Sequence, residues 1–253
     1  MNKANHLYAQ RSEYNEISVY DTTELYGEKG SFRVLKFANA EIQGAMDLNR
    51  PKRIVFEYPR AIIHLMEHND PALDNVFMIG HGIGTIATYF ADKRVKVAEL
   101  DSLVYDVSRA FFDYRGENVV IGDGRSLLEQ EQDHAFDYIV LDAFNARGTP
   151  LHLLSKPFFE LVKMKLISGG SVILNLVGRG ENDSLVKAIA TTLRSVFTTT
   201  QAFLLPSGGK RDVQNVLLMG RNGPITYLSK QMAGFLPIHI GQGHLIRDEN
   251  ISG

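Results

Sequence analysis

The sequence contains no cysteine among its 253 residues, which excludes disulfide bonds and thiolate metal sites. We also predict no metal. No apolar run reaches the length of about 18 residues that a membrane span needs, and residues 1–16 lack the apolar core of a signal peptide. We therefore expect a cytoplasmic protein with no membrane partner.

The chain has little net charge, because 27 Lys and Arg residues face 29 Asp and Glu residues. A formal charge of −2 gives no general attraction to nucleic acid. Lys210-Arg211 is too small a basic cluster to change that, so no nucleic-acid partner is predicted. The length suits one α/β domain with a small appendage.

The most informative stretch runs from Val76 to Asp101. An apolar run ends in three glycines at alternate positions, which predicts a buried strand followed by a tight turn. Apolar residues then recur at helical spacing, and a second apolar strand ends in Glu99-Leu100-Asp101. Strand, glycine turn, helix, strand and acid together predict one βαβ unit.

This unit is typical of a nucleoside-binding site. Glycines at 80, 82 and 84 let the backbone approach a ligand where a Cβ would collide, and the following helix directs free N–H groups towards it. An acid at the end of the second strand, Glu99, is placed to accept hydrogen bonds from ribose hydroxyls. The alternative is a tight turn that packs a helix on a sheet and binds nothing.

Around this unit we predict three regions: a small antiparallel β-module in residues 1–50, a larger domain in 51–223, and a tail in 224–253. In the larger domain, strands alternate with helices, which favours a mainly parallel sheet covered on both faces. Ligands bind beyond the carboxyl ends of such strands. In the tail, residues 227–236 are compatible with a helix, and we assign it no function.

Several short motifs, in order, resemble the spermidine synthase (polyamine aminopropyltransferase) family. The segments concerned are Ser12–Ile17, Gln43, Ile79–Gly84, Ala98–Asp101, Gly122–Gly124 and Phe136–Asp142. The resemblance implies a Rossmann-like AdoMet methyltransferase fold with a seven-stranded sheet and an N-terminal β-module. It also implies a homodimer that takes decarboxylated AdoMet or AdoMet as co-substrate and a small amine as acceptor.

The same resemblance implies roles for individual residues. Glu99 would hold the ribose, Asp123 would meet the adenine amino group, and Asp142 would be the catalytic acid-base group. The remaining donor-binding positions are Gln43, Gly80, Gly82, Gly84, Asp101 and Gly124. The substrate-binding positions are Tyr14, Asn15, Tyr58, Asn145 and His152.

Some of these positions have plainer interpretations. Asp101 is equally suited to cap the helix that starts at Ser102, and Asp123 suits a bare Gly-Asp-Gly turn. His152 is a candidate proton shuttle, but a solvent-facing or loop-anchoring role is more common. Tyr14, Asn15 and Gln43 have ordinary packing as their alternative.

The chain departs from the family where the family is acidic. Ile83 stands where the glycine loop carries the Asp that pairs with the ammonium of decarboxylated AdoMet, and Asn145 replaces the second carboxylate of the catalytic loop. Tyr58-Pro59-Arg60 replaces a Tyr-His-Glu segment. These changes weaken a polycation site and indicate a divergent branch of the family.

Three functions remain open from the sequence. The first is a spermidine-synthase-like transferase that moves an aminopropyl group from decarboxylated AdoMet to an amine. The second is an AdoMet-dependent methyltransferase, or a related alkyl transferase, acting on a small molecule. The third is a nucleoside-binding module without turnover.

Overall fold

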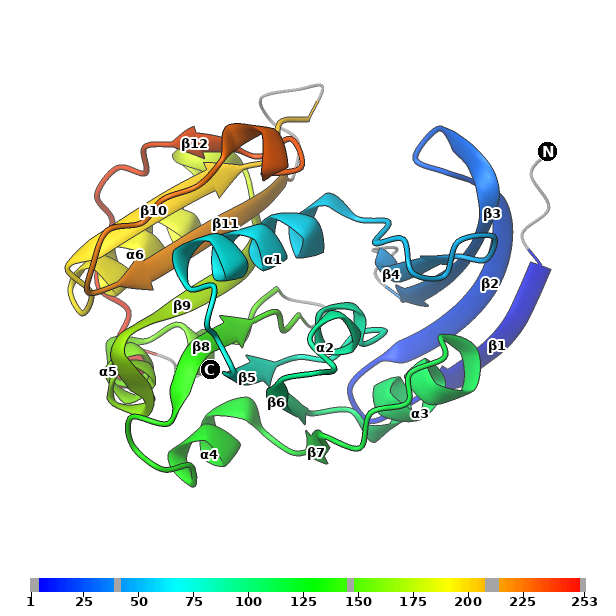
Figure 1. Ribbon diagram of the computed structural model, residues 1–253, viewed down its shortest axis with the longest axis horizontal. Coiled ribbons are helices and arrows are strands. Elements are labelled where there is room, and N and C mark those ends of the chain that lie inside the picture. Colours follow the sequence, from blue (N-terminus) through cyan, green and yellow to red (C-terminus); the bar gives the residue numbers. More distant parts are fainter. Residues whose placement is uncertain (1–4, 39–41, 145–147, 208–213, 251–253) are drawn as a thin grey trace.

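The computed structural model describes residues 5–38, 42–144, 148–207 and 214–250, which form two sheets lying side by side (Figure 1). The smaller sheet is antiparallel, in the order β1-β2-β3-β4. Its strands are β1 (Asn5–Arg11), β2 (Glu16–Leu25), β3 (Glu28–Phe37) and β4 (Ile42–Asp47). Sequence patterning does not reveal β1, because that edge strand is exposed along most of its length and shows no apolar alternation.

The larger sheet has eight strands across the described residues, in the order β12-β10-β11-β9-β8-β5-β6-β7. Five are parallel: β5 (Asn75–Ile79), β6 (Arg94–Glu99), β7 (Val119–Ile121), β8 (Phe136–Leu141) and β9 (Leu166–Gly178). The antiparallel strands are β10 (Thr199–Leu204), β11 (Gln214–Arg221) and β12 (Leu236–Ile238). The α/β methyltransferase-like fold expected from the sequence is confirmed, with one strand more than the seven expected.

Helices cover both faces of the larger sheet and enclose two apolar cores. One core lies beneath α4 (Gly124–Glu129), α5 (Lys156–Lys165) and α6 (Ser184–Arg194). The other lies beneath α1 (Glu57–Asn69) and α2 (Thr85–Tyr89). Both faces of the central strands are therefore buried, which explains their continuous apolar runs.

The smaller sheet packs against α3 (Ser102–Phe111) (Figure 1). Val104 and Val107 of the helix share a buried cluster with Ile17 and Val19 of β2. Arg33 adds a polar tie, because its Nη1 donates to the carbonyl of Phe111 over 3.2 Å. This packing fixes the β-module over the carboxyl ends of the parallel strands.

The expectation of a helix over residues 227–236 is wrong. The structure has a 3-10 turn, Ser229–Gln231, and then the strand β12. Ala233 and Gly234 both have positive φ angles, 52° and 95°, which a continuing helix does not allow. The described residues also contain 3-10 turns at Leu151–Leu153, Gly180–Asn182 and Asp248–Asn250.

Gly80 marks the point where β5 and β8 approach most closely at their carboxyl ends. Its φ is +97°, and a Cβ built there would lie 2.1 Å from the carbonyl oxygen of Asp142. Its own N–H donates to the carbonyl of Ala98 over 2.9 Å, so the backbone has little freedom to move away. Gly80 therefore sets the spacing between the glycine loop and Asp142.

We expect Gly80→Ala to lower the free energy of unfolding by about 3 kcal/mol. The new methyl group would clash with the Asp142 backbone, and alanine is also strained at a positive φ. Gly169→Ala is the matched control, since Gly169 has a φ of +87° but a methyl group there would meet no atom within 4 Å. The control should lose only about 1 kcal/mol. Urea denaturation measures both, and equal losses would contradict the crowding argument.

Candidate active site

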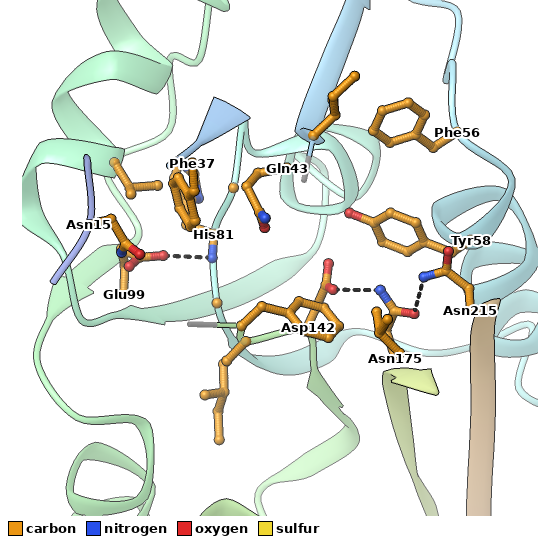
Figure 2. A pocket seen from close by; sticks show the side chains of 18 of the residues that line it. Asn15, Phe37, Gln43, Phe56, Tyr58, His81, Glu99, Asp142, Asn175 and Asn215 are labelled. Carbon is orange, nitrogen blue, oxygen red and sulfur yellow. Dashed lines mark hydrogen bonds between the residues drawn. The ribbon is translucent and has the colours of Figure 1, made fainter. Parts of the chain in front are cut away.

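A cavity of about 1320 Å³ lies between the β-module and the carboxyl ends of β5, β6, β7, β8 and β9 (Figure 2). Ligand pockets commonly measure roughly 300–1,000 Å³, so this volume has room for two small molecules together. The β-module contributes Asn15, Phe37 and Gln43, and the large sheet contributes Glu99 and Asp142. Residues far apart in the sequence therefore form one site.

The glycine loop runs along one wall of the cavity. Gly80, Gly82 and Gly84 all have positive φ angles. A Cβ on Gly82 would meet only the Gln43 carbonyl oxygen, at 3.6 Å, so the absence of a side chain leaves this part of the wall open. Gly84 lies outside the lining and instead leaves room for Tyr114, whose Cδ2 would be 2.3 Å from a Cβ. The helix that follows, α2, is only 5 residues long and adds little dipole.

Glu99 lies in the cavity wall at the end of β6 and is only 8% exposed. Its Oε2 accepts from the His81 N–H and its Oε1 from the Asp101 N–H, both over 2.9 Å. Burial raises the pKa of the carboxyl group to about 7, although these N–H donors oppose the shift. The carboxylate is held in a fixed orientation that leaves further lone pairs for a ligand.

His81 is buried beneath the loop, against Tyr114. Ser108 Oγ donates its proton to the Tyr105 carbonyl, so it accepts from His81 Nε2, 2.8 Å away. Burial lowers the pKa of His81 to about 4. The ring is therefore neutral at pH 7 and brings no positive charge to the cavity.

Asp101 joins the two sheets at the edge of the cavity. Its Oδ1 accepts from the Leu103 N–H over 3.1 Å, which makes it the N-cap of α3. Its Oδ2 accepts from the Ser12 hydroxyl and, over 3.4 Å, from the Asn15 side-chain amide. The helix-cap interpretation is thus correct. Tyr14, between these two residues, lines the cavity with a side chain that is 46% exposed.

Asp123 and His152 form a pair at another edge of the cavity. Asp123 caps α4 by accepting from the Ser126 N–H over 2.9 Å. Its Oδ2 lies 2.7 Å from His152 Nε2. Burial raises the pKa of Asp123, but the hydrogen bonds from Ser126 and His152 outweigh it and the net shift is downward. The His152 ring thus contacts the turn before α4, and Gly124 beside the pair is packed against Ile79.

Asp142 lies at the inner end of the cavity within a cluster of polar side chains (Figure 2). Its Oδ1 accepts from Asn175 Nδ2 over 2.9 Å, and Asn175 Oδ1 accepts from Asn215 Nδ2 over 3.1 Å. The Tyr58 side chain also lies close to Asp142. Burial raises the pKa of Asp142 to about 6, against the opposing effect of Asn175 and Tyr58. The same burial, with the nearby carboxylate, holds the pKa of Tyr58 well above its usual value.

The described lining of the cavity is acidic, since it contains no Lys or Arg side chain. Glu28 is partly neutralised by an ion pair with Arg53, which lies outside the lining. Glu57 is paired with Arg60 over 3.0 Å, and Asp123 contacts His152. The ring of the other lining histidine, His81, is neutral at pH 7. A cationic ligand is favoured there on electrostatic grounds. The seven lining carboxylates belong to Glu13, Glu28, Glu57, Glu99, Asp101, Asp123 and Asp142.

Sequence reasoning missed Asn175 and Asn215. A signal was present for Asn175, because it is the one polar side chain in the apolar core of its strand and is only 1% exposed. Ile83 packs against Gly44 of β4, where a Cβ would lie 2.6 Å from its Cγ2, and is not among the lining residues. Asn145 lies outside the described residues.

No group of acidic, histidine or cysteine side chains suited to holding a metal ion is present in the described residues. No helix within residues 5–38, 42–144, 148–207 or 214–250 is long and apolar enough to cross a membrane.

Comparison with known proteins adds a family to this geometry. The spermine/spermidine synthase domain matches residues 55–207. A putrescine N-methyltransferase 2 from Nicotiana attenuata is 28% identical over 202 residues, which are 76% of this chain and 51% of that protein. The chain thus spans about half the length of the curated relatives it matches first.

A polyamine aminopropyltransferase from Vibrio vulnificus is 27% identical over 229 residues, covering 83% of this chain and 72% of the relative. A solved spermidine synthase in complex with the transition state analogue AdoDATO superposes with a TM-score of 0.71 at 16% identity. That match covers 90% of this chain and 83% of the other, and it shows a shared fold. Both named relatives are transferases.

The raised pKa of Glu99 predicts that stability falls as pH rises. The unfolded carboxyl, with a pKa of 4.5, binds fewer protons than the folded one between pH 4.5 and pH 7. Between pH 5 and pH 8, wild type should therefore lose about 2 kcal/mol more unfolding free energy than Glu99→Gln. Urea titrations measure this, with the exposed Glu160→Gln as control. If the unfolding free energies of wild type and Glu99→Gln change equally with pH, the pKa of Glu99 is not raised.

Proposed function

The chain belongs to the spermine/spermidine synthase family, and we propose that it transfers an aminopropyl group from decarboxylated AdoMet to a small amine. The acidic lining of the cavity carries this proposal. Decarboxylated AdoMet has a sulfonium and an ammonium group but no carboxylate, and the acceptor amine is also cationic in water. A cavity with carboxylates and no described Lys or Arg complements both molecules.

The residues around the glycine loop fit a sulfonium nucleoside. Glu99 presents a fixed carboxylate for the ribose hydroxyls, and Asp123 lies at the neighbouring strand end for the base. Gly82 leaves an open wall opposite Gln43, where a side chain would intrude. When bound, the donor supplies an electrophilic carbon next to positively charged sulfur.

Asp142 is proposed to prepare the acceptor. An ammonium group must lose a proton before its nitrogen can attack, and a carboxylate with a pKa of about 6 is ionised and able to accept that proton at pH 7. The new C–N bond forms as the C–S bond breaks, and the sulfur leaves as a neutral thioether. Asn175 donates to Asp142 and keeps it oriented towards the cavity.

N-methylation of an amine by intact AdoMet is the second candidate. Ile83 supports it, because this apolar side chain, packed on Gly44, supplies no carboxylate to pair with the donor's ammonium or to repel its methionyl carboxylate. The similarity to putrescine N-methyltransferase points the same way. The absence of Lys and Arg side chains from the described lining opposes it, since neither is there to pair with a methionyl carboxylate. The homodimer and the cytoplasmic location stay predictions.

Calorimetry with both donors tests the proposal. We expect decarboxylated AdoMet to bind at least tenfold more tightly than AdoMet, a difference of about 1.4 kcal/mol. Incubation with putrescine should then give an aminopropyl adduct detectable by mass spectrometry. Tighter binding of AdoMet with methylation of the amine would establish the second candidate instead, and failure to bind either donor would refute both.

Asp142→Asn should lower kcat by at least about 100-fold, because the amide cannot accept the proton. Binding of methylthioadenosine should change less than about twofold, because the variant keeps the volume and one acceptor oxygen. Asp137→Asn is the matched control at the opposite end of β8, where the side chain accepts from the Asp74 and Asn75 N–H groups. An Asp142→Asn enzyme with wild-type kcat would remove this residue from the chemistry.

A further inference from the structure

Residues 240–248, here called the closing segment, are firmly attached to the larger domain. The side chains of Ile240 and Ile246 are buried in the core beneath α5 and α6. The Ile246 N–H donates to Thr192 Oγ1 over 3.0 Å, and its carbonyl accepts from the Lys156 N–H over 2.8 Å. Gly243 passes so close to α6 that a Cβ would lie 2.6 Å from the Ala188 nitrogen. The segment is part of the fold and delivers Asp248 to a defined place.

Asp248 binds two elements that flank the cavity. Its two oxygens accept from Arg125 Nη1 and Nη2 over 3.0 and 2.8 Å, in a two-pronged ion pair at the start of α4. Its Oδ1 also accepts from the hydroxyl of Ser155, the fully buried N-cap of α5. The Arg125 bonds hold the pKa of Asp248 below its usual value, so it is ionised at neutral pH. Through Asp248, α4 and α5 are tied together.

Arg125 connects Asp248 to the cavity wall. Its Nη1 also donates to the His152 carbonyl over 3.2 Å. The His152 ring in turn contacts Asp123, and both residues line the cavity. Asp248 and Arg125 do not line it themselves. A continuous chain of polar contacts thus runs from the closing segment to the edge where the base of the donor is proposed to lie.

We propose that Asp248 is a positioning residue for the donor site, acting through Arg125 to hold the His152 backbone and the His152–Asp123 pair at the cavity edge. The inference rests on the proposed function, because it takes that edge as the place of the donor's base. Without Asp248, Arg125 keeps only its longer carboxylate contact, from its Nε to Glu129 over 3.4 Å, and the segment around His152 is held less firmly. Donor binding must then also order the His152–Asp123 pair at the cavity edge, which weakens the affinity.

The geometry sets this ion pair apart from an ordinary surface one. Exposed pairs contribute little, because water screens them and two flexible side chains must be ordered. Here the Asp248 side chain is 41% exposed but the Arg125 side chain only 21%, and the fork binds both carboxylate oxygens and a backbone carbonyl together. Planar, bidentate pairs of this kind are stronger and more directional. A lysine at position 125 cannot reproduce the arrangement.

The test is calorimetry of methylthioadenosine with full-length Asp248→Asn and Arg125→Lys. Each should raise the Kd about tenfold, and the double variant should add little, because both break one connection. The KM for the donor should rise in parallel, while kcat and the KM for the amine stay within about twofold. Asp248→Glu should recover part of the affinity. Glu249→Gln, which removes the adjacent charge, is the control and should bind as wild type does.

The outcomes separate this inference from the proposed function. If Asp248→Asn and Arg125→Lys bind methylthioadenosine with the wild-type Kd, the positioning role is overturned and the donor site still stands. A loss of kcat, donor and amine KM together, with no recovery by Asp248→Glu, would also overturn it in favour of general destabilisation. Absence of nucleoside binding by wild type would refute the donor site itself, and this inference with it.

Discussion

The site depends on one constraint: the β-module must stay closed over the carboxyl edge of the parallel strands. Asp101 is central to it, because one carboxylate caps α3 and accepts from Ser12 and Asn15 of the module. Ile83 contributes from the glycine loop by packing against Gly44. Ile83 is therefore a packing contact between the glycine loop and β4 of the β-module.

Two of the cavity carboxylates, Glu99 and Asp142, are buried, which makes their ionisation costly. Uncharged hydrogen-bond donors offset this cost. Glu99 accepts from two backbone N–H groups. Asp142 accepts from the Asn175 side-chain amide, which in turn accepts from the Asn215 amide. The ring of His81, whose backbone N–H donates to Glu99, is kept neutral by burial. The charges of Glu99 and Asp142 are thus not paired with a basic side chain among the described residues, and they are available to a cationic ligand.

The sequence was sufficient to predict those features of the fold and of the site that depend on local or periodic patterns. The βαβ unit from Val76 to Asp101 follows from apolar runs and glycine spacing, and so does the position of Asp142 at a strand end. Contacts between distant segments had no such signal. Nothing near Asp248 indicates that it meets Arg125, since their pairing depends on how the closing segment crosses α6. The role of Asp101 was undecided for a related reason: capping is local, but its bonds to Ser12 and Asn15 are not.

The charge of the two perturbed acids depends on what the cavity holds. Glu99 and Asp142 have pKa values raised to about 7 and about 6 by burial, so each is partly protonated in mildly acidic solution. A cation entering the cavity favours the ionised form of both, because opposite charge lowers a carboxyl pKa. A bound sulfonium donor or a bound ammonium group would therefore keep Asp142 ionised in mildly acidic solution as well.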